Sequence, residues 1–447
     1  MPPTDLPHAQ PPHALDAQDP LRGCRDLFHI PPSAKDPSRP SIYMTGNSLG
    51  CQPKATRALI EQELDDWARL GVEAHLKGRD PWLPYHEWFR GPAARLVGGR
   101  EGEAVMMNSL TCNLHLLMVS FFRPQSERTK IVIEDSAFPS DSYAVQSQLR
   151  FYGLDPTHNL IRLKPRQGEH TLRTSDIEAF LKDEGASIAL VLLGAVNYLT
   201  GQWFDMDRIT AAAKEQGCMV GWDLAHAAGN VPLKLHDCGG VGADFAAWCT
   251  YKYLNSGPGA VAGAWVHERH FPHGGPPLRA GPLHSSEPAR SAGLPRFEGW
   301  WGTDPATRFQ MKPEITPPES VEAWQLSNPP ILALAPVKAS MQIFDKVGMQ
   351  ALREKSLKLT AYLEQLIDSQ LRDKIEVLTP RDPTQRGAQL SLVVKSPTAT
   401  RGLDKRLHEE SIVVDFREPN VIRVAPTPLY NTFEDCWGLV EGLRRVI

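Results

Sequence analysis

Residues 218–226 read Cys-Met-Val-Gly-Trp-Asp-Leu-Ala-His, and residues 250–259 read Thr-Tyr-Lys-Tyr-Leu-Asn-Ser-Gly-Pro-Gly. The first segment is an apolar run ending in Asp223, which is typical of a strand buried on both faces of a parallel sheet. In the second segment, Lys252 lies where an apolar strand meets a Gly/Pro turn, 29 residues after Asp223. Because ligands gather at the carboxyl edge of a parallel sheet, we expect both side chains to face one site.

This pair of residues suits pyridoxal phosphate (PLP). A free lysine amine has a pKa of about 10.4 and is protonated at neutral pH, whereas an imine formed with the aldehyde of PLP is reactive there. The cofactor withdraws electrons while its ring nitrogen stays protonated, which a buried carboxylate such as Asp223 favours. Alone, Asp223 could equally cap a following helix, but its pairing with Lys252 favours the cofactor site.

The composition is that of an ordinary soluble enzyme, with 447 residues, 41% hydrophobic residues and a formal net charge of -4. Two domains are expected, because single cores rarely grow beyond about 250–300 residues. The slight acidity predicts neither a nucleic-acid nor a membrane partner, and no run of about 20 apolar residues is present. Seven cysteines without a CxxC pair indicate a reducing, cytoplasmic setting, and we predict no metal site.

Three regions differ along the chain. The first 40 residues contain ten prolines and predict an extended arm, disordered or draped over a neighbour, with structure beginning near Ile42. Residues 41–335 are expected to form the large α/β domain, and residues 336–447 a smaller α+β domain. The Pro/Gly-rich stretch 272–295 is expected to be a surface loop.

Within the large domain, helical periodicity at 52–70 and 111–122 precedes an alternation of strands and helices. The expected strands are 130–133, 188–193, 219–222, 245–250 and 261–266, with helices at 175–184 and 207–217. Such alternation predicts a mostly parallel sheet with helices on both faces. Ser175 and Glu178 have the spacing of a capping box, and Gly185 and Gly217 of helix stops.

In the smaller domain, a long helical region follows Pro329-Pro330 and runs to about Leu371. The expected strands are 374–378, 390–394, 412–416 and 421–424. A final helix is expected to start at Thr432, with Asp435 three residues on.

Eight short motifs, in this order along the chain, together resemble those of the kynureninase family. They are Gly46-Asn47-Ser48-Leu49-Gly50, Asn108-Ser109-Leu110-Thr111-Cys112-Asn113-Leu114-His115, Phe138-Pro139-Ser140-Asp141, Asp223-Leu224-Ala225-His226, Tyr251-Lys252-Tyr253-Leu254-Asn255, Gly299-Trp300-Trp301-Gly302, Ser327-Asn328-Pro329-Pro330 and Arg423-Val424-Ala425-Pro426. The likeness spans roughly residues 40–445. It implies the PLP-dependent transferase-like fold of the aspartate aminotransferase type (fold type I) and cleavage of kynurenine to anthranilate and alanine.

The resemblance assigns residues to the reactive end of the cofactor. Lys252 would form the imine, Asp223 would pair with the ring nitrogen, and His226 would lie beside it. Phe138 would stack on the ring, although such a phenylalanine is often plain core. Asp141 would hydrogen-bond near the phenolic edge of the cofactor.

Three further residues match the phosphate end. Leu110 and Thr111 would meet the phosphate at a helix N-terminus, where unsatisfied N–H groups and the helix dipole favour an anion. Taken alone, Thr111 could simply be a helix N-cap. Tyr251 would give its hydroxyl to the phosphate and take part in proton transfer, or it could be a plain aromatic strand residue.

The resemblance also implies a homodimer with shared active sites, because Trp300 and Asn328 match positions that reach the site from a second subunit. Arg423 matches the arginine that grips the α-carboxylate of the substrate, a task for which its planar fork is suited, although an arginine on a strand could also face solvent. His75, Ser48 and Asn328 match positions around the aromatic ring of the substrate. Because all three can hydrogen-bond, we expect 3-hydroxykynurenine to be accepted; otherwise His75 belongs to a solvated helix end.

Two departures from the family pattern concern Gly194, where a serine is often found, and the stretch 272–295, which looks like an insertion. Rival readings are a cysteine desulfurase, an aminotransferase, or a regulator that binds the cofactor without turnover. A desulfurase needs a mobile nucleophilic cysteine, whereas Cys436 falls in the final predicted helix. Aminotransferases lack the Trp300 motif, and retention of Lys252, Tyr251 and Arg423 argues against a regulator.

Overall fold

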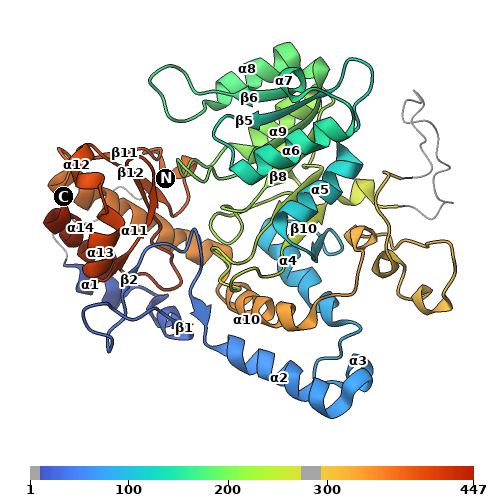
Figure 1. Cartoon of the computed structure of the whole chain (residues 1–447), viewed down its shortest axis with the longest axis horizontal. Helices are drawn as coiled ribbons and strands as arrows, with labels where there is room; N and C mark the ends of the chain where they lie inside the picture. Colours follow the sequence, from blue (N-terminus) through green and yellow to red (C-terminus); the bar gives the residue numbers. More distant parts are fainter. Residues whose placement is uncertain (1–10, 273–292) are drawn as a thin grey trace.

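The computed structural model describes residues 11–272 and 293–447, which form a large α/β part and a smaller C-terminal part (Figure 1). The large part contains a seven-stranded sheet in the order β4-β10-β9-β8-β7-β5-β6. Its strands are β4 (Ala104–Met106), β5 (Lys130–Glu134), β6 (Leu160–Leu163), β7 (Ile188–Gly194), β8 (Met219–Asp223), β9 (Phe245–Trp248) and β10 (Gly263–Val266). Strands β9, β8, β7, β5 and β6 run parallel to one another, whereas β10 is antiparallel to both β9 and β4, which confirms the predicted mostly parallel sheet.

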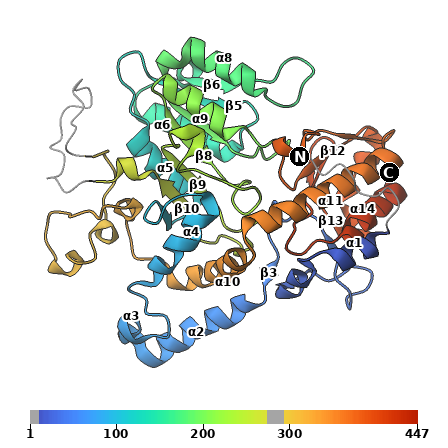
Figure 2. The same cartoon turned by 180° about the vertical axis from the view of Figure 1, so that it is seen from behind.

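Helices cover both faces of this sheet (Figures 1 and 2). Alternate side chains of β5 enter two separate cores: Val132 packs on one face, and Ile131 and Ile133 on the other. The Val132 face is covered by α4 (Arg90–Val97), α8 (Thr174–Glu184), α9 (Met206–Glu215) and α10 (Ile331–Val347). The opposite face is covered by α5 (Leu110–Phe121) and α6 (Pro139–Phe151), and α7 (Pro156–Asn159) leads into β6.

The smaller part is built on an antiparallel sheet in the order β11-β12-β15-β14. Its strands are β11 (Ile375–Val377), β12 (Leu390–Val394), β14 (Asp415–Arg417) and β15 (Val421–Val424). Its third core is completed by α11 (Met349–Gln370), α13 (Leu403–Glu409) and α14 (Phe433–Val446), with the short α12 (Pro397–Thr400) between β12 and α13. The predicted α+β character of this region is confirmed. The helical region after Pro330 is two helices, because Gly348 takes φ +80° between α10 and α11.

The N-terminal segment corrects the prediction of an extended or disordered arm. Residues 1–10 lie outside the described residues, but residues 11–40 contain α1 (Pro12–Gln18), a 3-10 helix (Arg22–Leu27) and β1 (Phe28–His29). The carboxylate of Asp16 accepts the N–H groups of Phe433 (2.8 Å) and Glu434 (3.0 Å), the first two residues of α14. Asp19 and Lys355 form a buried ion pair at 2.7 Å. These polar anchors tie the segment to its own C-terminal part.

Other boundaries differ where strands form unexpected pairs. Helix α2 (Ala55–Leu70) begins three residues later than predicted, because β3 (Gln52–Pro53) pairs with β1. The predicted strand 412–416 divides into β13 (Ile412–Val413), which pairs with β2 (Ile42–Tyr43), and β14, which pairs with β15.

The capping box predicted at the start of α8 is wrong. The N-cap residue is Arg173, and no side chain caps the helix. Glu178 instead accepts a hydrogen bond from Arg208 Nε of α9 at 2.8 Å. At the end of α9 the predicted stop is confirmed, since Gly217 takes φ +73°.

Helix α2 and the following α3 (Ala74–Lys77) lie at the lower edge of the molecule in both views (Figures 1 and 2). The side of α2 that is buried carries Thr56, Glu63 and Asp66, while Leu64 and Trp67 are 42% and 58% exposed. Part of the apolar periodicity of this helix, at Leu64 and Trp67, therefore faces away from the core of its own chain, whereas Leu59 and Ile60 are half-buried. None of the helices within residues 11–272 and 293–447 has the length and apolar character needed to cross a membrane.

We predict that Asp19→Ala weakens the attachment of the N-terminal segment. Removal of Asp19 leaves the Lys355 ammonium buried without its partner, which typically costs about 3–5 kcal/mol. Chemical denaturation monitored by far-UV circular dichroism measures this loss. Asp26→Ala, at an exposed position of the same segment, serves as the control and leaves the transition unchanged. Equal stability of both variants would contradict the anchoring role.

Candidate active site

A cavity of about 220 Å³ lies at the carboxyl edge of the parallel strands. It is bounded by the ends of β5, β7 and β8, the segment after β9, and the N-termini of α5 and α6. Eight predicted cofactor residues line it together: Leu110, Thr111, Phe138, Asp141, Asp223, His226, Tyr251 and Lys252. Lys252 and Asp223 thus lie in one site at the ends of the strands, where the sequence predicted them.

Lys252 and His226 are in direct contact within this cavity. Lys252 Nζ lies 3.1 Å from His226 Nε2. Burial, together with the positive charges of Lys252, Arg423 and Arg417, lowers the pKa of His226 well below its ordinary value. The imidazole is therefore neutral at pH 7, and its Nε2 accepts the hydrogen bond that Lys252 donates. Nδ1 of the same ring is buried and has no partner within the described residues.

Two aspartates form a carboxyl pair at the end of β8. Asp223 is 6% exposed, and its Oδ1 accepts the N–H of Ala225 at 2.7 Å in a turn, so it caps no helix. Burial raises the pKa of Asp141 well above its ordinary value, and the charge of Asp223 and a hydrogen bond to it raise that pKa further. Burial and the neighbouring Asp223 therefore favour the protonated form of the Asp141 carboxyl group, which can donate a hydrogen bond to Asp223.

Two helix N-termini meet at the other end of the cavity. Helix α5 starts at Leu110 with Ser109 as its N-cap residue, so the reading of Thr111 as the N-cap is wrong. Helix α6 starts at Pro139, and Ser140 Oγ lies 2.9 Å from Thr111 Oγ1. Two helix dipoles, free N–H groups and two hydroxyls thus converge on one place, which favours a bound anion.

Aromatic side chains border the middle of the cavity. Phe138 is 43% exposed, and its ring centroid lies 5.8 Å from Lys252 Nζ and 5.2 Å from the ring of Tyr198. A phenylalanine ring open on one face is available to stack on a ligand. Burial and the nearby Cys249 and Asp223 raise the pKa of Tyr251, so its hydroxyl is a proton donor at neutral pH.

Arg423 lies behind this cavity rather than in its wall. It is 2% exposed, its Nη2 lies 2.6 Å from Asp415 Oδ2, and its Nη1 donates to the carbonyl of Tyr198 at 2.7 Å. Its guanidinium stands 5.8 Å from the ring of Tyr198, which does line the cavity. The alternative prediction that the Arg423 side chain faces solvent is wrong.

Four further predicted residues lie outside the cavity of their own chain. Trp300 and Asn328 are exposed, and Trp300 Nε1 donates to the carbonyl of Arg308 at 3.2 Å. His75, on α3, packs edge-on against Trp82 with ring centroids 5.4 Å apart. Ser48 is half-buried in the turn whose Gly50 N–H donates to the carbonyl of Tyr251 at 2.8 Å.

The cavity also contains side chains to which the sequence analysis gave no role: Glu134, Ser140 and Tyr198. A usable signal existed for Glu134, because it directly follows the apolar run 131–133 as Asp223 follows its own strand. Ser140 lies beside two residues that were chosen. Tyr198 sits in a loop after β7, and nothing in its local sequence indicates this position.

The residues of the cavity fit PLP. The paired helix N-termini match a phosphate, the open Phe138 ring matches an aromatic ring, and the buried acidic pair matches a protonated ring nitrogen. Lys252 Nζ lies 5.8 Å from the Phe138 centroid in the same cavity, so its amine is available to the aldehyde of a cofactor bound there.

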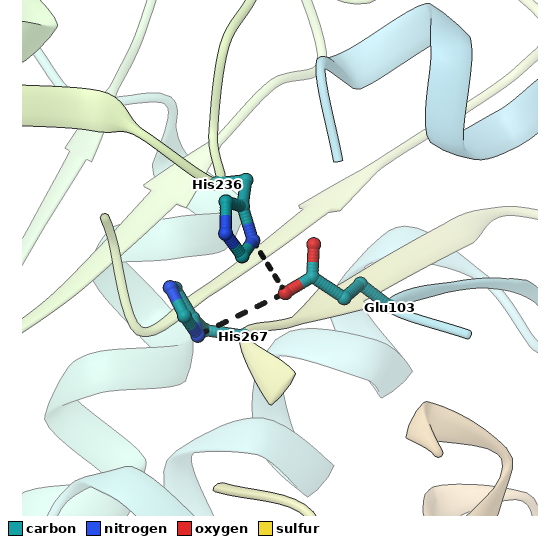
Figure 3. Close-up of side chains that lie close together, drawn as sticks. All are labelled: Glu103, His236 and His267. Atoms are coloured by element: carbon teal, nitrogen blue, oxygen red, sulfur yellow. Dashed lines mark hydrogen bonds and ion pairs between the residues drawn. The ribbon is translucent and has the colours of Figure 1, made fainter. Parts of the chain in front are cut away.

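A second polar cluster has the residue types of a metal site. Ligand atoms of Glu103, His236 and His267 all lie within 4.8 Å of one another, with Glu103 Oε1 at 2.9 Å from His236 Nδ1 and 3.8 Å from His267 Nδ1 (Figure 3). Glu103 also accepts N–H groups from Arg100 (2.7 Å) and Glu268 (2.8 Å), and His267 Nδ1 accepts another. Since these lone pairs are used, the cluster fits a structural role that joins the strand ends.

The desulfurase alternative needs an accessible cysteine thiolate. Cys436 is fully buried in α14, and burial raises the pKa of its thiol well above the ordinary value. It therefore has neither the mobility nor the charge of such a nucleophile.

Sequence comparisons identify relatives along the whole chain. A profile described as Kynureninase C-terminal domain matches residues 352–443, and one described as Aminotransferase class-V matches residues 85–283. A kynureninase from Salinispora tropica is 56% identical over 97% of this chain and 96% of its own length. A kynureninase from Myxococcus xanthus is 53% identical over 96% of this chain and 95% of its own length.

Solved structures with low sequence identity show the same fold. An apo cysteine desulfurase from Thermococcus onnurineus aligns with a TM-score of 0.68 and 19% identity over 91% of this chain and 94% of that one. A C-DES mutant with glycine covalently linked to its PLP cofactor aligns with a TM-score of 0.70 and 17% identity, over 91% of this chain and 97% of that one. The fold is that of the PLP-dependent transferases, as predicted, and the full-length relatives show that the chain belongs to the kynureninase family.

Proposed function

We propose that this protein hydrolyses the bond between the β and γ carbons of kynurenine or 3-hydroxykynurenine. The products are alanine and anthranilate or its 3-hydroxy derivative, a step of tryptophan degradation toward NAD. The single observation that carries the proposal is the Lys252–His226 contact in a cavity that also holds the Asp223–Asp141 pair, in a chain with kynureninase relatives over nearly its full length.

PLP would be bound covalently to Lys252, and when bound it supplies an electron sink for the substrate's α carbon. The N-termini of α5 and α6 would hold its phosphate with Thr111 and Ser140, and Phe138 would cover its ring. The Asp223 carboxylate would hold the proton on the ring nitrogen. Asp141 would support this role, because its carboxyl group favours the protonated form and can hydrogen-bond to Asp223.

Proton movements fall to Lys252 and Tyr251. Lys252 Nζ, held in place by Nε2 of the neutral His226, would take the proton from the α carbon of a bound substrate. Water would add to the γ carbonyl carbon and become part of the released carboxylate. The Tyr251 hydroxyl, which stays protonated at neutral pH, would give a proton to the β carbon when the β–γ bond breaks. Arg423 would bind the α-carboxylate through N–H groups that Asp415 and Tyr198 leave free.

The cleavage itself is tested with purified protein, PLP and kynurenine. We expect fluorescent anthranilate, and an activity loss of about 10²–10⁴-fold or more in Lys252→Ala, because positioned proton transfer contributes at least that much. Lys405→Ala, at an exposed position of α13, serves as the matched control and stays active. Formation of a keto acid in place of alanine would instead support an aminotransferase.

We further propose that two copies of the chain share their active sites. Support comes from the exposed apolar side chains of α2 and α3, Leu64, Trp67 and Leu76, and from the exposure of Trp300 and Asn328. His75, which lies on α3, would then approach the cavity of a partner.

Complementation tests the shared site. Lys252→Ala and Trp300→Ala are each expected to be nearly inactive, and a re-equilibrated mixture regains about one quarter of the sites, because one site of each mixed dimer is intact. Lys252→Ala mixed with Asp223→Ala is the control, since both changes fall in the same cavity and no site is restored. Recovery in neither mixture would contradict a shared site.

Around the aromatic ring of the substrate, we propose that His75, Ser48 and Asn328 provide hydrogen-bonding groups. None of them lines the cavity of the same chain, so this pocket would be completed across the dimer.

His75→Ala is predicted to lower the preference of the enzyme for 3-hydroxykynurenine over kynurenine. One lost hydrogen bond corresponds to about 0.5–1.5 kcal/mol, or a change of about 2–13-fold in the ratio of kcat/KM values. Steady-state kinetics with both substrates measures this ratio, and an unchanged ratio would show that His75 does not touch the 3-hydroxyl group.

We infer a cytoplasmic, reducing setting from the thiols. All seven cysteines are free, and five of them are buried. Burial raises the pKa of both Cys51 and Cys238 to about 12, which is typical of inert packing residues.

A further inference from the structure

Glu134 ends β5 at the same sheet edge as the cofactor residues. In the sheet, β7 lies between β5 and β8, and its last residue, Gly194, is in register with Asp223. Three neighbouring strands therefore end in Glu134, Gly194 and Asp223. All three residues line the same cavity.

The missing side chain of Gly194 leaves room for the Glu134 carboxyl group. The N–H of Gly194 points at both carboxyl oxygens, 3.4 Å from Oε1 and 3.3 Å from Oε2. A Cβ atom at position 194 would lie 3.0 Å from Oε1, closer than ordinary van der Waals contact. The glycine thus lets Glu134 lie directly over the end of β7 toward Asp223.

We propose that Glu134 is a further positioning residue for the reaction, which reaches over Gly194 and sets the charge around the Asp223–Asp141 pair. This inference rests on the proposed function, because its effect on the reaction passes through the group that Asp223 holds. It gives a role to the glycine by which the chain departs from its family pattern.

The charges around Glu134 support this role. Burial raises its pKa to about 7, the negative charge of Asp223 also raises it, and the N–H of Gly194 lowers it. The other ionisable groups that line the cavity are Asp141 on α6, Tyr198 after β7, Asp223 and His226 at and after β8, and Tyr251 and Lys252 after β9. On β6, Arg162 is occupied by a hydrogen bond to Ser142 Oγ.

The sign of the effect follows from these charges. Below pH 7 the Glu134 carboxyl group is neutral. Above pH 7 Glu134 adds a negative charge near Asp223, which favours a proton on the ring nitrogen of a bound cofactor. Both kcat and the absorbance of the bound cofactor should therefore change with pH along a limb centred near 7.

Glu134→Gln tests the proposal, because an amide of nearly the same shape cannot ionise. We expect the limb near pH 7 to vanish from the absorbance titration, recorded without kynurenine, and from the kcat profile. Borohydride reduction verifies that the cofactor is still attached. A limb near pH 7 that is unchanged in Glu134→Gln would overturn the proposal. If the unmodified protein shows the limb and Glu134→Gln lacks it, but the unmodified protein forms no anthranilate, the result would count against the proposed function alone.

Gly194→Ser and Gly194→Ala form a matched pair that is informative even when Glu134→Gln folds poorly. Both add a Cβ atom beside Oε1, but only serine adds a hydroxyl that can donate to the carboxylate. A donated hydrogen bond favours the ionised form, so the serine variant should shift the limb down by about 1 pH unit relative to alanine. Identical limbs in the two variants would contradict control by Glu134.

Discussion

Several ionisable side chains are held in one small cavity, and the attraction and repulsion among them govern this site. Asp141 hydrogen-bonds to Asp223, Glu134 lies across Gly194, and Lys252 donates to a neutral His226. In a medium of low dielectric constant such charges interact far more strongly than in water. The charge of each group therefore affects the protonation state of its neighbours. A cofactor that reacts with its ring nitrogen protonated and with a neutral lysine amine requires such control.

The scaffold places these groups through the parallel sheet. Strands β5, β7 and β8 end side by side, so Glu134, Gly194 and Asp223 become neighbours although they are far apart in sequence. Helices α5 and α6 start at the same edge and bring two positive helix ends to it. The small C-terminal sheet contributes Arg423, oriented by Asp415 on the neighbouring strand.

Sequence reasoning predicted the sheet and the pairing of Lys252 with Asp223, because apolar runs and strand ends are local signals. The prediction for residues 11–40 was wrong. A high proline content indicates that backbone N–H donors are missing, but it gives no information about ion pairs with distant residues such as Lys355. Sequence reasoning also missed Glu134, whose place depends on the empty space at Gly194 across a neighbouring strand. The apolar stripe of α2 was visible in sequence, but the surface that it faces was not.

The covalent attachment of the cofactor tests the central claim most directly. The protein, saturated with PLP and reduced with borohydride, is digested and the labelled peptide sequenced by mass spectrometry. The arrangement around Asp223 and His226 predicts a single label on Lys252, in the peptide that contains Tyr251. A label on another lysine, or a protein that binds no PLP at any concentration, would contradict it.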